Sequence, residues 1–127
     1  MKNLFLLAIL LLTTVCLSQE DNPETKIIPN AEIDIHPQFK GGLQEFYKYI
    51  ADNYRAPKQK GLSGRVFVTF VIEKDGSVTD GKIIRDVGHG TGAEALRVLK
   101  RSPKWTPGMQ NGKPVRVLYS LPIAIRT

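Results

Sequence analysis

Few side chains in this sequence are placed to carry out chemistry. The two histidines, His36 and His89, lie in separate stretches, and no cysteine pair or carboxylate cluster has the spacing of a metal site. A His89–Asp86 pair is a conceivable general base, but a loop histidine near an aspartate rarely has that role. Four serines also lack the glycines of a nucleophile elbow, namely Ser63, Ser77, Ser102 and Ser120. We therefore expect a protein that is not an enzyme and that has no metal and no other cofactor.

The N-terminus has the pattern of a secretory signal. Lys2 precedes an unbroken apolar run from Leu4 to about Leu17, after which the chain turns polar. We expect residues 1–18 to be a signal peptide that is removed on export. Two alternatives remain. The run could be an uncleaved anchor, although it is shorter than the roughly 20 residues that span a bilayer. Cys16, the only cysteine, could carry a lipid, but Val15 is bulky for that motif.

The charge of the chain limits the class of partner. Its formal net charge is +6 and its isoelectric point is about 9.6. In a cytosolic protein this balance would suggest nucleic acid. Export favours an acidic protein partner or an anionic membrane face. The alternative, to which we give equal weight, is that the charge only keeps a small domain soluble.

A β-hairpin from Gly64 to Arg85 is the clearest predicted element. Asp75-Gly76 favours a tight reversal between its two strands. A two-residue turn would place Ile83 on the inner face, whereas a three-residue turn with Gly76 in the left-handed conformation would place Val78 and Ile84 there. In the first strand, four apolar residues alternate with the others and predict a buried face: Val66, Val68, Phe70 and Ile72.

Two helices are predicted around this hairpin. The first runs from Gly42 to about Asn53, and the second begins at Thr91, where Glu94 completes a capping box. We expect Trp105, which follows the second helix, to act as a lid over the core. The stripe of the first helix is expected to be core and comprises Leu43, Phe46, Tyr47, Ile50 and Tyr54.

The last strand has the longest period-two pattern in the chain. From Val115 to Ile125 the odd positions are almost all aliphatic, with one tyrosine. Pro122 cannot donate a hydrogen bond to a neighbouring strand, which places this strand at an edge of its sheet. A long edge strand with an apolar side is a template for the addition of another strand. Earlier in the chain, the alternation from Ala31 to Ile35 predicts a short edge strand.

The order of these features resembles the TonB C-terminal domain family. The likeness extends roughly from Pro37 to Arg126 and includes the turn Lys74-Asp75-Gly76-Ser77. The resemblance implies an α+β fold, with two helices packed on a three-stranded antiparallel sheet. We expect this domain at residues 37–127, after a flexible lead-in at 19–36. Four further motifs carry the resemblance: Phe39-Lys40-Gly41-Gly42, Glu94-Ala95-Leu96-Arg97, Pro103-Lys104-Trp105-Thr106-Pro107-Gly108 and Gly112-Lys113-Pro114-Val115.

The resemblance also implies a function. Domains of this type grip the TonB box of outer-membrane transporters by β-strand addition, in energy-dependent transmembrane transport. The further partners that we consider are inner-membrane proton-driven motor proteins and a second copy of the chain. We expect no nucleic acid as a partner. The implied location is the periplasm, or the periplasmic side of the inner membrane if the apolar run stays as an anchor. The alternative is a structural module that dimerises or docks through the same edge without energy transduction.

The resemblance implies two groups of partner-binding residues. The first is in the last strand: Val115, Arg116, Val117, Leu118, Tyr119, Ser120, Leu121 and Ile123. The second follows the first helix and comprises Tyr54, Arg55 and Pro57. In this segment Ala56 replaces the tyrosine of the family pattern. The short lead-in likewise differs from the long proline-rich spacer of complete TonB proteins.

Overall fold

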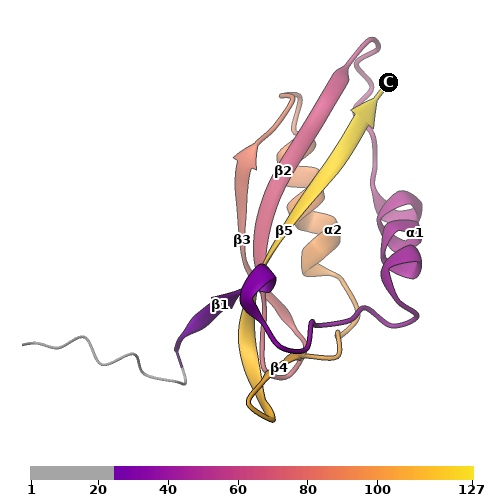
Figure 1. Ribbon diagram of the computed structural model, residues 1–127. Coiled ribbons are helices and arrows are strands. Elements are labelled where there is room, and N and C mark those ends of the chain that lie inside the picture. Colours follow the sequence, from indigo (N-terminus) through magenta and orange to yellow (C-terminus); the bar gives the residue numbers. More distant parts are fainter. Residues whose placement is uncertain (1–24) are drawn as a thin grey trace, which may run out of the picture.

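The computed structural model describes residues 25–127, so the predicted signal peptide lies outside the described residues. The elements are β1 (Ile27–Pro29), a 3₁₀ turn η2 (Asn30–Glu32), α1 (Leu43–Asn53), β2 (Ser63–Ile72), β3 (Val78–Arg85), α2 (Thr91–Lys100), β4 (Gly108–Gln110) and β5 (Lys113–Arg126). The strands lie in the order β1-β5-β2-β3, and β4 pairs with β5 (Figure 1). Within the described part, neither helix combines the length and the hydrophobicity that a membrane span needs.

The α+β class and the two helices are confirmed, whereas the strand count is larger than expected. The predicted antiparallel strands are present as β2, β3 and β5, and two short strands are added to them. β4 pairs antiparallel with the start of β5, and β1 pairs parallel with Arg116–Leu118. β1 comes from the stretch that was expected to be a flexible lead-in. The predicted strand from Ala31 to Ile35 is reduced to a single bridge between Ile35 and Met109.

The hairpin turn follows the three-residue alternative. The Glu73 amide donates to the Ser77 carbonyl oxygen at 2.8 Å, and Gly76 has a φ of 86°. Val78 therefore pairs with Ile72, as that alternative requires. An extra residue near Asp80 then shifts the register of β3.

The register shift decides which isoleucine faces α2. After the bulge, Ile83 pairs with Val68, and its side chain lies against Gly92 at the start of α2. Ile84 points outward and is 64% exposed, so the expectation that it would lie on the inner face is wrong. The inner face of β3 thus combines Val78 from one alternative with Ile83 from the other.

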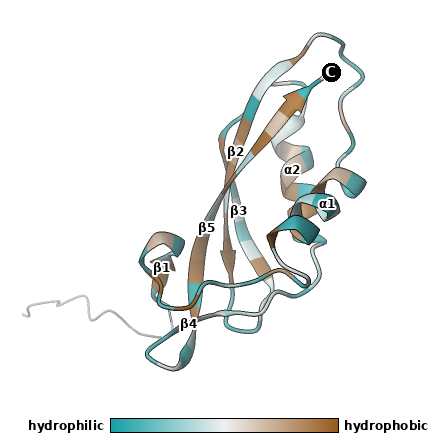
Figure 2. Cartoon of the chain, turned by 45° about the vertical axis from the view of Figure 1, so that its right-hand side comes forward, coloured by the Kyte–Doolittle hydropathy of each residue, from teal (hydrophilic) through white to brown (hydrophobic). Residues whose placement is uncertain are grey.

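Both helices lie on one face of the sheet and enclose an aromatic core (Figures 1 and 2). Phe46 of α1 and Phe70 of β2 are fully buried, and Trp105 is only 4% exposed. The Trp105 ring lies 4.7 Å from the Phe46 ring and 5.5 Å from the Tyr119 ring, measured between centroids. The predicted role of Trp105 as a lid is confirmed.

The start of α2 differs from the predicted capping box. The residue before the helix is Gly90 in the left-handed conformation, and Thr91 lies inside the helix. The Thr91 hydroxyl donates to the Gly88 carbonyl oxygen at 2.8 Å. Glu94 instead accepts from the backbone amide of Arg55 at 2.6 Å and pairs with Arg97. Glu94 therefore links α2 to the segment after α1, and it does not cap α2.

An ionic cluster fixes β1 beside β5. The Arg116 guanidinium donates to both carboxylate oxygens of Glu73, at 2.5 and 3.1 Å, and to the carbonyl oxygen of Thr25 at 3.0 Å. A second carboxylate, that of Asp80, lies 3.5 Å from Arg116. Hydrogen bonds from Arg116 hold the pKa of Glu73 below its ordinary value of 4.5.

This cluster predicts acid sensitivity. Because folding lowers the pKa of Glu73, its ion pair stabilises the fold above pH 4.5 and is lost as the pH falls through the folded-state pKa. Glu73→Gln should reduce the free energy of unfolding at neutral pH by about 1–2 kcal/mol, since both side chains are partly exposed to water. It should also flatten the loss of stability below pH 4.5. Thermal unfolding across this pH range measures both effects. Glu32→Gln, which changes an exposed acid, is the matched control, and equal behaviour of the two variants would contradict the role of Glu73.

Candidate functional site

The two long sides of β5 differ along its length. One side pairs with β2 from Val117 to Arg126. On the other side, β1 pairs with Arg116–Leu118, while β4 pairs with the start of β5 at Lys113–Val115. From Tyr119 to Arg126 no described strand pairs with that second side, and we call this stretch the open edge (Figure 1).

The strand residues implied by the family resemblance divide between the covered and the open part. Val115 pairs with Gly108, and Arg116–Leu118 pairs with β1. Val117 is fully buried, and Arg116 is engaged by Glu73. The remaining ones, Tyr119, Ser120, Leu121 and Ile123, lie on the open edge. The side chain of Leu121 is itself buried in the core, so only its backbone is part of a surface.

Pro122 shows which backbone groups point away from β2. In an antiparallel pair, each residue directs both its N–H and its C=O either toward its partner strand or away from it. Pro122 pairs with Phe67 but has no N–H, so it fits only an outward-pointing position. By the same alternation, Ser120 and Ala124 direct their N–H and C=O groups outward. The open edge therefore offers backbone donors on both sides of Pro122.

A groove between α1 and β5 borders the open edge. At one end is the Ile123 hollow, which has a volume of about 410 Å³. It lies between Pro122–Ile125 of β5 and three residues on the α1 side, Tyr47, Ala51 and Tyr54. At the other end is the Tyr119 hollow, of about 330 Å³, lined by Leu43, Phe46, Trp105 and Tyr119 among others. Both are mainly apolar. Together with the unpaired backbone, they can hold an extended chain that carries apolar side chains.

The segment after α1 fixes one wall of this groove. The Tyr54 hydroxyl donates to the Thr91 carbonyl oxygen at 2.9 Å, and the Arg55 amide donates to Glu94. Burial raises the pKa of the Tyr54 hydroxyl. The ring of Tyr54 also lines the Ile123 hollow, whereas the side chain of Arg55 is exposed and Pro57 is half-buried. Of the three residues expected here, Tyr54 is thus the one that borders the open edge.

Sequence reasoning did not find Tyr47 and Ala51 as site residues. Tyr47 belongs to the stripe that was assigned to the core, but it is 48% exposed. Leu43 of the same stripe is 55% exposed, whereas Phe46 and Ile50 are buried. The apolar stripe of α1 is therefore wider than the part of the protein that covers it. The sequence pattern does not show this difference, and only the structure reveals it.

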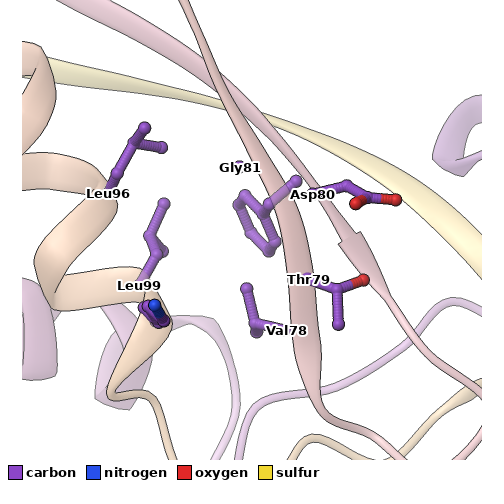
Figure 3. Close-up of a pocket in the computed structure, with 8 residues that line it drawn as sticks. Val78, Thr79, Asp80, Gly81, Leu96 and Leu99 are labelled. Atoms are coloured by element: carbon purple, nitrogen blue, oxygen red, sulfur yellow. The ribbon is translucent and has the colours of Figure 1, made fainter.

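The opposite edge of the sheet is built differently. β3 also has no second neighbour among the described strands, but it has a bulge and the cations Lys82 and Arg85. A bulge and charged side chains both discourage the pairing of an edge strand. A hollow of about 420 Å³ lies between β3 and α2, with Leu96, Leu99 and Val78 around it, while Thr79 and Asp80 point away (Figure 3). From Tyr119 to Ile125 the open edge has no charged side chain, and its guards are Pro122 and the cation Arg126 at its end.

No catalytic arrangement is found around the histidines in the described residues. His36 pairs with the side chain of Asn30 at 2.9 Å, and the Asp86 carboxylate accepts from the Gly88 amide at 3.1 Å. Among residues 25–127, no group of three or more His, Cys, Asp or Glu side chains could hold a metal ion.

Comparison with known proteins gives one match. Residues 55–126 match the family described as Gram-negative bacterial TonB protein C-terminal. The matched range begins just after α1 and includes α2 and every described strand except β1. No curated protein and no solved structure matches the chain.

Proposed function

Because the chain belongs to the TonB C-terminal domain family, we propose that it is an exported module that binds an extended segment of an outer-membrane transporter by β-strand addition. Domains of this family are non-enzymatic, act in the cell envelope and interact with outer-membrane receptors in transport. The proposed segment is the TonB box of such a transporter. The proposed location is the periplasm, reached through the signal peptide at residues 1–18.

The open edge is the observation that carries this proposal. Its outward backbone groups lie beside an apolar groove, so an added strand gains both hydrogen bonds and buried surface. The proposed contacts are the backbone from Tyr119 to Ile125 and the side chains of Tyr47, Ala51 and Tyr54. The residues Val115–Leu118 are not among them, because β1 already pairs with Arg116–Leu118 on that side of β5 and Val115 lies beyond it. Coupling to a proton-driven inner-membrane motor is part of the same proposal.

Peptide titration followed by NMR tests the proposed contact. Extended peptides that contain a TonB box should shift the amide signals of Ser120 and Ala124, because their N–H groups would donate to the peptide. The amides of Lys82 and Ile84 on β3 serve as the control and should not move. Shifts confined to β3, or none at all, would refute the proposal. If the same signals depend on protein concentration without peptide, the edge instead joins two copies of the chain, which light scattering would confirm.

A further inference from the structure

One side of α1 faces the open edge and has no cover. Leu43 and Tyr47, one helical turn apart, are the most exposed large apolar side chains of α1. Leu43 lines the Tyr119 hollow, and Tyr47 lines the Ile123 hollow. The helix therefore runs along the open edge from Tyr119 toward Ile125. A strand added to β5 would lie next to this uncovered side.

The two hollows have a fixed separation along β5. Tyr119 and Ile123 are four residues apart, or about 13 Å in a strand. Residues paired across neighbouring strands place their side chains on the same face, and side chains at i, i+2 and i+4 share a face. An added strand therefore presents residues i and i+4 to the two hollows at once. Its residue i+2 lies opposite Leu121, whose buried side chain leaves no hollow.

We propose that the segment bound at the open edge carries apolar side chains at i and i+4, which fill the Tyr119 and Ile123 hollows and cover Leu43 and Tyr47. This inference rests on the proposed strand addition and specifies which strands are selected. A full alternating apolar pattern is not required, since the position at i+2 adds little. The two end positions determine affinity.

Charge adds a second requirement for the bound segment. The open edge ends at Arg126, and the whole of β5 contains no acidic residue. The selected segment therefore has an acidic residue next to the apolar side chain that enters the Ile123 hollow. Moving this acid from one end of a peptide to the other reports whether the segment runs parallel or antiparallel to β5.

Peptides of equal composition test the spacing. Short Ser/Thr peptides with one glutamate and two valines are compared, with the valines either at i and i+4 or at i and i+3. The first should bind about tenfold more tightly, because only this spacing places both valines on the helix side. It should also change the fluorescence of Trp105, the only tryptophan, which lines the Tyr119 hollow.

The outcomes separate the inference from the proposed function. Equal affinities, with amide shifts at Ser120 and Ala124 for both peptides, would overturn the spacing rule and leave strand addition intact. The absence of these shifts for every peptide, including authentic TonB-box sequences, would overturn both.

A protein variant tests the Ile123 hollow by itself. Ala51→Leu fills this hollow from α1, and it should abolish the advantage of the i, i+4 peptide while weak binding remains. Ala93→Leu on α2 changes another exposed helical alanine, outside the groove, and should leave the advantage unchanged. An unchanged preference in Ala51→Leu would overturn the assignment of this hollow.

Discussion

Ala124→Pro is expected to weaken the binding of extended peptides at least tenfold and to leave the domain folded. Ala124 directs its N–H away from β2, so a proline there removes an outward donor without breaking the β2–β5 ladder. The new ring also occupies the space that a neighbouring backbone needs. Isothermal titration calorimetry with a TonB-box peptide measures the loss, and thermal unfolding checks the fold.

Ala124→Val is the matched control for this experiment. Valine keeps the N–H and suits a strand, so peptide affinity should stay within a few-fold of the wild type. Equal affinity of the proline and valine variants would show that the open edge does not pair with the peptide. A proline at Val117 could not answer the question, because Val117 is buried between β1 and β2 and its replacement would disturb folding.

Gly76→Ala is expected to be the most destabilising single-methyl change in the described fold, with a loss of more than about 3 kcal/mol in the free energy of unfolding. Gly76 has a φ of 86°, and a Cβ at this position would overlap the carbonyl oxygen of Trp105. The Trp105 amide also donates to the Gly76 carbonyl oxygen at 2.8 Å. A methyl group here would therefore displace Trp105 from the aromatic core. Urea denaturation measures the change.

Gly112→Ala separates backbone strain from this clash. Gly112 has a similar φ of 76°, but no atom lies within 4 Å of the position that its Cβ would take. Only the left-handed conformation is penalised there, at about 1–2 kcal/mol. Similar losses in the two variants would mean that the contact between the hairpin turn and Trp105 contributes little.

Patterns between close neighbours in the sequence predicted most of the elements. The alternation in β2, the stripe of α1 and the Asp75-Gly76 turn each depend on residues a few positions apart. β1 could not be predicted in this way. Ile27–Pro29 is too short to show a period, and its partner Arg116–Leu118 lies near the other end of the chain.

The site was predictable only in outline. Pro122 correctly indicated that part of β5 lies at an edge. Which part is open depends on β1, and no residue in β5 reports its presence. The groove was missed for a related reason. An amphipathic stripe has the same pattern whether the protein's own sheet covers it, as at Phe46, or leaves it uncovered, as at Tyr47.

The parallel pairing of β1 with β5 determines how tension would pass through the domain. β1 and a strand bound at the open edge would lie end to end along the same side of β5. A pull between the chain before β1 and a bound strand would then travel along β5 alone, past Leu118 and Tyr119, without crossing the aromatic core. Such a pull loads in shear both the hydrogen bonds between β1 and β5 and those between β5 and the bound strand. The bonds of each set then share the load instead of breaking one by one. The bond from Arg116 to Thr25 adds a clamp at the end of β1 where this tension would enter.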